Sequence, residues 1–162
     1  MTGGCPDDGR RTFRRPATLL VAAAATAAID LAAKAWAREA LPSSGVQAGP
    51  LDLRLSFNPG VAFSVGAAAP AGLVVAVTAL ITVAVAVFAW RVVPDGRRAR
   101  MIALAAVLGG AVGNLADRVA DGVVTDYLQT GWWPTFKHAD TAIVIGAALL
   151  VLDAARPFGA AR

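Results

Sequence analysis

The chain is poor in the residues on which many soluble active sites and disulfide scaffolds depend. It holds one cysteine and one histidine among 162 residues, and charged side chains make up only 16% of it. A single cysteine, Cys5, excludes an intrachain disulfide. His138 has no second histidine or nearby cysteine with which to share a metal ion, so no metal site is predicted. No motif around Ser56 or Ser64 indicates a serine nucleophile.

Hydrophobic residues are what the chain has in abundance. They make up 57% of it, and the mean hydropathy of +0.60 is too high for an ordinary soluble domain. A membrane-spanning helix takes about 20 apolar residues, with about 17 as the lower limit. Four runs come close to that length: residues 16–37, 71–90, 101–116 and 139–155. We therefore predict an all-α membrane protein with four transmembrane helices, because no period-2 pattern is long enough for a barrel.

The predicted domain organisation is a single membrane domain between two tails. The domain covers residues 16–156, a disordered basic tail covers 1–15, and a short C-terminal tail covers 157–162. The first run continues past Asp30 to Trp36, so we expect it to stay as a transmembrane helix rather than to be removed as a signal peptide.

The chain has a net charge of +4, and its basic residues lie mainly on one predicted side of the membrane. Arginines precede the first run, separate the second from the third and follow the fourth, at positions 10, 11, 14, 15, 91, 97, 98, 100, 156 and 162. The other connections carry only Arg38, Arg54, Arg118 and Lys137. This positive-inside pattern predicts that both termini are cytoplasmic. The basic residues orient the protein and indicate no nucleic-acid partner.

The first run contains two charged residues on one helix face. Asp30 and Lys34 are spaced i,i+4 and can form an ion pair, which removes much of the cost of burying either charge. The interpretation that the pattern favours is stabilisation, with Lys34 reaching the outer interface and Asp30 as its partner. A direct chemical role for the pair is the alternative.

The connection after the first run alternates between apolar and polar residues. In residues 51–57 the leucines and Phe57 face one way and the polar residues the other, which predicts a half-buried strand. The following Asn58-Pro59-Gly60 suits a tight turn. Asn58 either belongs only to that turn or contacts the backbone of an extended peptide.

The third run combines small residues with a polar face. Glycines at 109, 110 and 113 allow close helix packing. Asn114, Asp117 and Arg118 follow at i, i+3 and i+4, on one face. Arg118 can hold a carboxylate or a carbonyl oxygen, while an Asp117–Arg118 ion pair at the helix end is the simpler alternative.

Two further aspartates lie at the ends of adjacent predicted membrane spans. Asp126 lies in an apolar setting, and Asp140 opens the fourth run, where it could simply cap a helix. Their placement on one predicted membrane face favours a joint function, and we hypothesise that the pair activates water for peptide-bond cleavage. A small transporter or proton channel is the alternative, although the second run has almost no polar residues to support it.

Five ordered blocks together resemble lipoprotein signal peptidase, the type II signal peptidase of bacterial membranes. The blocks are Asp30 with Lys34, residues 58–63, 109–118 and 124–127, and Phe136 with Ala139 and Asp140. They follow the family's order and extend over residues 17–155, which makes the match more specific than any one block.

The resemblance implies a four-helix fold with a small extracytoplasmic β-cradle in the bacterial inner membrane. It also implies an aspartic endopeptidase that cuts diacylglyceryl-modified prolipoproteins before the lipidated cysteine, with its active site on the extracytoplasmic side. Asp126 and Asp140 fall on the family's catalytic dyad. Its supporting or substrate-binding positions correspond to Asp30, Lys34, Asn58, Gly60, Asn114, Asp117, Arg118 and Ala139. We expect a monomer that contacts membrane phospholipid and uses no metal or organic cofactor.

The chain departs from the family pattern beside the second aspartate. The family usually has asparagine where this chain has Lys137, three residues before Asp140. A lysine there can still donate a hydrogen bond, but its charge is expected to lower the pKa of the carboxyl group. The connection from Asp126 to Asp140 is also short for the family.

Overall fold

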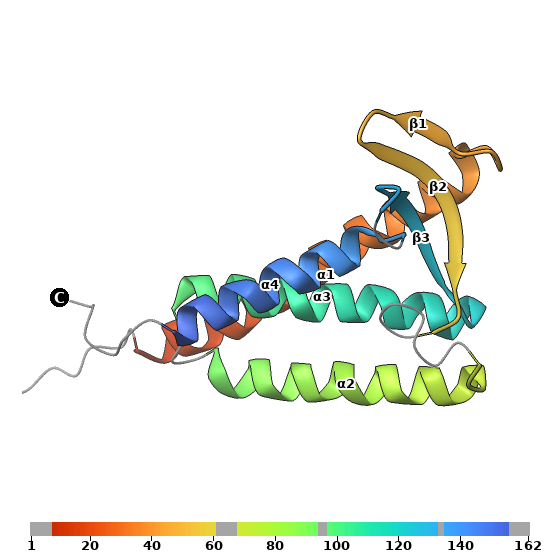
Figure 1. The fold of residues 1–162 in the computed structure, drawn as a ribbon. Coiled ribbons are helices and arrows are strands. Elements are labelled where there is room, and N and C mark those ends of the chain that lie inside the picture. Colours follow the sequence, from red (N-terminus) through yellow and green to blue (C-terminus); the bar gives the residue numbers. More distant parts are fainter. Residues whose placement is uncertain (1–7, 61–67, 94–96, 133–134, 156–162) are drawn as a thin grey trace, which may run out of the picture.

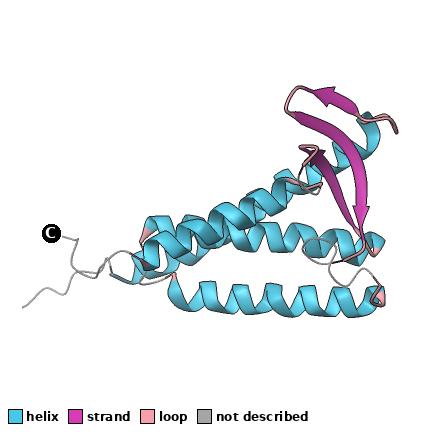
Figure 2. Cartoon of the chain, viewed as in Figure 1, coloured by secondary structure: helices cyan, strands magenta, loops and turns pink. Residues whose placement is uncertain are grey.

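The computed structural model describes residues 8–60, 68–93, 97–132 and 135–155. Within these ranges the elements are α1 (Asp8–Ala40), β1 (Val46–Ala48), β2 (Leu51–Asn58), α2 (Ala71–Val92), α3 (Arg98–Asp121), β3 (Val124–Gln129) and α4 (His138–Ala154). The strands gather at one end of the helices, here called the sheet end (Figure 1, Figure 2). The opposite end, where α1 begins and α4 finishes, is called the far end.

Three of the described helices are long and apolar enough to cross a membrane: Arg15–Ala40 within α1, and the whole of α2 and α3. Large apolar side chains on these helices face outward, including Val21, which is 69% exposed, and Leu80, which is 71% exposed. The predicted all-α membrane fold with a small sheet is confirmed. The remaining helix, α4, has 17 residues, which is the lower limit for a span, so its crossing of the membrane stays a prediction.

Helix α3 lies at the centre of the bundle and contacts α1, α2 and α4. Its glycines make this possible, because a Cβ atom on Gly109 would stand 2.5 Å from the carbonyl oxygen of Ala23 in α1. A Cβ atom on Gly110 would stand 2.7 Å from the carbonyl oxygen of Ala139 in α4. The predicted packing role of these small residues is confirmed.

The apolar core is concentrated toward the far end. It joins Leu19 of α1 to Ala89 of α2 and to Leu104 and Leu108 of α3. The sheet end is different, because its buried residues include many charged side chains. The bundle is therefore held by apolar packing at one end and by polar contacts at the other.

The sheet has the order β1-β2-β3, and both pairs are antiparallel. The strand predicted over residues 51–57 is present as β2, but its predicted single apolar face is wrong. Leu51 and Phe57 are exposed, whereas Leu53 and Leu55 are half-buried. The cause is a register shift against β3 between Leu53 and Ser56, which interrupts the two-residue alternation.

The first helix begins earlier than the apolar run. Its first residue is Asp8, whereas the span was predicted to start at 16 after a disordered tail. Residues 8–15 are thus helical, and residues 1–7 of the predicted tail lie outside the described chain. Arginine propagates helices well, so the helix extends through the arginine-rich segment although Pro16 lacks one backbone donor.

The third helix ends later than predicted, and a strand follows it. α3 continues to Asp121 instead of residue 116 and stops at Gly122, whose φ of 75° is the left-handed conformation that glycine adopts freely. Asn114, Asp117 and Arg118 are therefore helical. The strands β3 and β1 were not predicted, because each depends on pairing with β2 rather than on a local pattern.

Candidate active site

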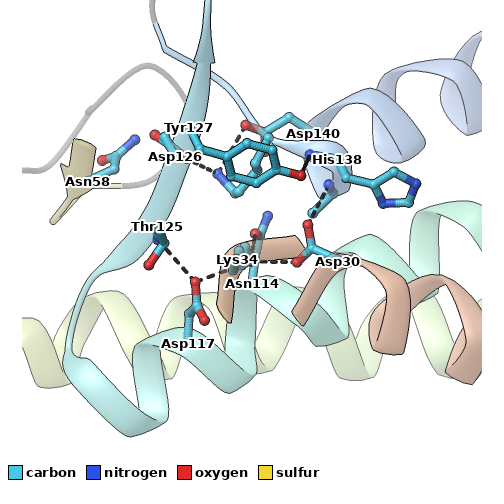
Figure 3. A network of polar contacts seen from close by, with 12 residues as sticks. Asp30, Lys34, Asn58, Asn114, Asp117, Thr125, Asp126, Tyr127, His138 and Asp140 are labelled. Atoms are coloured by element: carbon cyan, nitrogen blue, oxygen red, sulfur yellow. Dashed lines mark hydrogen bonds and ion pairs between the residues drawn. The ribbon is translucent and has the colours of Figure 1, made fainter. Parts of the chain in front are cut away.

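The two aspartates at the mouths of the spans meet at the sheet end. Asp126 lies in β3, and Asp140 lies in the first turn of α4. Both accept hydrogen bonds from one ammonium group: Lys137 Nζ is 2.6 Å from Asp126 Oδ1 and 3.0 Å from Asp140 Oδ2 (Figure 3, dashed lines beside the two aspartates). The distance between Asp126 Oδ1 and Asp140 Oδ2 therefore cannot exceed the sum of these two hydrogen-bond lengths.

The two carboxylates differ in their access to solvent. The side chain of Asp126 is 4% exposed and that of Asp140 is 38% exposed. Lys137, which joins them, is as buried as Asp126. A water molecule or a peptide can thus approach the pair from the side of Asp140.

Burial has the largest effect on the pKa of Asp126. It raises the pKa of this carboxyl group above its usual range, because the ionised form loses solvation. Lys137 lowers the pKa, the charge of Asp140 raises it again, and the side chain of Asn58 lowers it. The net shift is upward, so Asp126 holds a proton more readily than an exposed aspartate does.

A second cluster with the same composition lies deeper between the helices. Lys34 Nζ is 2.5 Å from Asp30 Oδ2, 3.2 Å from Asp117 Oδ2 and 3.4 Å from Asn114 Oδ1. The predicted Asp30–Lys34 pair is confirmed, but the prediction that Lys34 reaches the outer interface is wrong. Lys34 is 1% exposed and turns toward α3, because the Asp117 carboxylate of α3 and the Asp30 carboxylate of its own helix compensate its charge (Figure 3).

Asp30 fixes the start of α4. Its Oδ1 atom accepts a 2.8 Å hydrogen bond from the backbone nitrogen of Ala139, and no side chain of α4 itself caps the helix. Capping by Asp140 was the simple alternative for that residue and is wrong. Gly113 makes room for Asp30, since a Cβ atom there would stand 2.6 Å from Asp30 Oδ2. The deep cluster thereby positions the residue next to Asp140.

Asp117 links the deep cluster to the strand that carries Asp126. Its Oδ2 atom accepts a 3.0 Å hydrogen bond from the backbone nitrogen of Thr125. The guanidinium group of Arg38 lies 3.7 Å from Asp117 and donates to the Thr125 hydroxyl. Thr125 and Arg38 were not among the predicted site residues, because their contacts with Asp117 depend on how β3 and α1 pack against α3.

Arg118 and Asn58 also act on Asp126, Arg118 through its charge and Asn58 through a side-chain hydrogen bond. Arg118 donates a hydrogen bond to the carbonyl oxygen of Gly60, and its charge acts on both Asp126 and Asp140. Asn58 Oδ1 accepts a 2.9 Å hydrogen bond from the Gly60 nitrogen, as expected for a tight turn. Residues 61–63, which belong to the same predicted motif, lie outside the described chain.

The Asp117–Arg118 ion pair predicted as the simpler alternative is replaced by other contacts. Asp117 pairs with Lys34 and Arg38, and Arg118 turns to the backbone of the β2 turn. All the predicted site residues therefore lie in one polar region at the sheet end. They are Asp30, Lys34, Asn58, Gly60, Asn114, Asp117, Arg118, Asp126, Ala139 and Asp140.

The chain matches one known protein family over most of its length. The model of the family described as signal peptidase (SPase) II matches residues 22–156. The chain belongs to the signal peptidase II family. The match includes both aspartate–lysine clusters and all three described strands.

Several curated members of the signal peptidase II family are similar in sequence. A lipoprotein signal peptidase of Rhodococcus jostii is 41% identical over 112 residues, which are 63% of this chain and 52% of that protein. One from Paraburkholderia phytofirmans is 44% identical over 110 residues, which are 65% of this chain and 64% of that protein. The matched part thus spans between half and two thirds of these two relatives.

Solved structures share the fold. A bacterial membrane enzyme determined by the in meso method at 2.3 Å resolution superimposes with a TM-score of 0.74. The superposition covers 85% of this chain and 87% of the other, at 22% sequence identity. A second such structure, at 1.9 Å resolution, gives a TM-score of 0.72.

Proposed function

We propose that this protein is a membrane aspartic endopeptidase that removes signal peptides from diacylglyceryl-modified prolipoproteins. The observation that carries the proposal is the meeting of Asp126 and Asp140 on one ammonium group at the sheet end. Membership of the signal peptidase II family supports the substrate class, since relatives carry the name lipoprotein signal peptidase.

The proposed chemistry divides two roles between the two carboxyl groups. Asp140, which is open to solvent, takes a proton from water, and the water oxygen attacks the scissile carbonyl carbon. Asp126, whose raised pKa favours its protonated form, gives its proton to the departing amine as the C–N bond breaks. The cycle closes when the proton on Asp140 passes to Asp126, which restores the starting protonation of both groups. No covalent link to the protein forms.

The substrate is proposed to approach along the sheet. Arg118 and Asn58 flank Asp126, and each is placed to fix peptide backbone beside it. Two large apolar side chains at the sheet end, Phe57 at 55% and Trp132 at 81% exposed, suit contact with lipid chains or headgroups. The enzyme would thus draw its substrate from the membrane, together with bound phospholipid, and act as a monomer.

The proposed orientation places the sheet end outside the cytoplasm of a bacterial inner membrane. The arginines at 91, 97, 98 and 100 lie around the junction of α2 and α3, at the far end, which supports a cytoplasmic far end. α1 begins and α4 finishes at the same end, so both termini would be cytoplasmic. The two aspartates then face the outer leaflet.

Cleavage of a synthetic lipopeptide tests the proposal. The peptide carries a diacylglyceryl group on its cysteine, and the purified protein should release the segment before that cysteine. Asp126→Asn and Asp140→Asn should each lower kcat by about 100-fold to 10,000-fold while the protein stays folded. Asp153→Asn, which changes a carboxylate at the far end, is the control and should keep near-parental activity. Normal cleavage by either dyad variant would reject the proposal.

A further inference from the structure

The ammonium group of Lys137 lies between the two carboxylates, where a shared proton would lie in a pair of carboxylic acids without a cation. Lys137 is the residue before α4, and its extended backbone directs the side chain back toward β3. The residue is 4% exposed, and its ammonium nitrogen lies within 3.0 Å of both carboxylates. A buried cation with two anionic partners is fixed in place, because moving it would leave all three charges without compensation.

The charge balance of the pair follows from this position. Two neighbouring carboxylates cannot both ionise cheaply, so an isolated pair keeps one proton until the pH is high. An ammonium group between them compensates one negative charge, which makes ionisation of either carboxyl group easier. The effect opposes burial, which favours the protonated form of Asp126.

We propose that Lys137 is a positioning residue that holds the dyad together and extends its working range to lower pH. Its ammonium group compensates one negative charge of the pair, so that one carboxylate stays ionised, and available as the base, at lower pH than it would beside an uncharged residue. The role in catalysis rests on the proposed function, but the effect on carboxyl ionisation does not.

Other charged and titratable groups surround the same site. From α3, the charge of Arg118 acts on both carboxylates. From α1, Asp30 contacts the α4 backbone and Lys34 lies behind it. From β3, the Tyr127 hydroxyl lies 3.4 Å from the backbone nitrogen of His138, which carries a titratable ring. Lys137 differs from these groups because it contacts Asp126 and Asp140 directly.

The activity test compares the pH dependence of kcat/KM in the parent, Lys137→Met, Lys137→Gln and Lys137→Arg. Methionine has similar length without charge, glutamine keeps a hydrogen-bond donor without charge, and arginine keeps the charge. An opposite charge at this range moves a carboxyl pKa by about one to three units. The acid limb should therefore move to higher pH by that amount in the Met and Gln variants and stay near the parental value in the Arg variant.

Arg100→Met provides the matched control for the loss of a cation. Arg100 pairs with Asp153 at the far end, 2.6 Å from its Oδ2 atom. Its loss should leave the acid limb of the pH profile unchanged. Identical acid limbs in the parent and in both uncharged Lys137 variants would overturn the inference.

A spectroscopic titration separates this inference from the proposed peptidase activity. Infrared difference spectra report the C=O stretch of protonated carboxyl groups, and the spectrum of Asp126→Asn assigns the band of the dyad. The midpoint of this band should move to higher pH in Lys137→Met or, if that variant does not fold, in Lys137→Gln. An unmoved midpoint overturns the role of Lys137 even if the enzyme cleaves lipopeptide. A moved midpoint supports it even if no cleavage occurs.

Discussion

Two clusters in this molecule have the same ionic composition and differ in access to solvent. Lys34 joins Asp30 to Asp117, and Lys137 joins Asp126 to Asp140. In the deep cluster all three side chains are at most 6% exposed. In the outer cluster one carboxylate, that of Asp140, is 38% exposed. A closed cluster can only hold elements together, whereas an open one can also meet water and substrate.

The two clusters are also connected, with the deep one supporting the outer one. Asp30 binds the backbone of α4 next to Asp140, and Asp117 binds the backbone of β3 next to Asp126. Each carboxylate of the deep cluster therefore positions one carboxylate of the outer cluster. This arrangement explains why costly buried charges are retained between apolar helices.

Removing the cation from the deep cluster should have the largest effect on stability. Lys34→Met leaves the carboxylates of Asp30 and Asp117 buried without their shared partner, which should lower the free energy of unfolding by about 3–5 kcal/mol. Thermal or denaturant unfolding in detergent measures the loss. Lys137→Met is the matched control and should lose less, because Asp140 can reach water. Equal losses would contradict the distinction between a closed and an open cluster.

Filling the space beside Asp30 should have a smaller effect. In Gly113→Ala the new Cβ atom would stand 2.6 Å from Asp30 Oδ2, so the carboxylate must move from Lys34 and from the α4 backbone. Such overpacking costs about 1–3 kcal/mol of unfolding free energy. Gly72→Ala in α2 is the control, since a Cβ atom there meets nothing within 4 Å. A Gly113→Ala variant as stable as the control would show that Asp30 is not closely held.

The raised pKa of Asp126 predicts a pH-dependent difference in stability. A carboxyl group whose pKa is raised by folding stabilises the protein below its unfolded pKa, and this stabilisation is lost as the pH rises through the folded value. The amide introduced by Asp126→Asn does not titrate, so the variant should gain stability relative to the parent as the pH rises through that window. Unfolding measured across the acidic and neutral range tests the sign. If Asp126→Asn instead loses stability relative to the parent as the pH rises, burial does not have the largest effect on the pKa of Asp126.

The ion pair between Arg100 and Asp153 at the far end should contribute least to the free energy of unfolding. Arg100 is 37% exposed and pairs with Asp153, which Arg97 also approaches at 3.8 Å. Because Arg100 is partly open to solvent and Arg97 remains beside Asp153, Arg100→Met should cost less than about 1 kcal/mol of unfolding free energy. Unfolding at low and high salt checks this estimate. A loss comparable to that of Lys34→Met would remove the contrast between the two ends of the bundle.

Local patterns made much of the fold predictable. Long apolar runs indicated the membrane helices, and alternation of polar and apolar residues indicated β2 although its register shift could not be anticipated. The spacing of Asp30 and Lys34 predicted their ion pair, because an i,i+4 contact needs only the helix that contains it.

Contacts between distant segments could not be predicted from spacing. β3 forms by pairing with β2 and by a bridge to Phe136, so the bond between Thr125 and Asp117 had no local signal. Asp30 meets the nitrogen of Ala139 across 109 positions of the chain. Lys137 was recognised as a departure from the family pattern, but its contact with both aspartates depends on how α4 and β3 meet.

Asp126 and Asp140 are proposed to act together on the tetrahedral state of a peptide bond. A lipopeptide in which a tetrahedral hydroxyl-bearing carbon replaces the scissile carbonyl tests it most directly, because such analogues bind roughly 100-fold or more tighter than the matching ground-state ligand. The parent protein should show this preference in a binding titration, and both Asp126→Asn and Asp140→Asn should lose it. Equal preference in the parent and in the two variants would contradict the account.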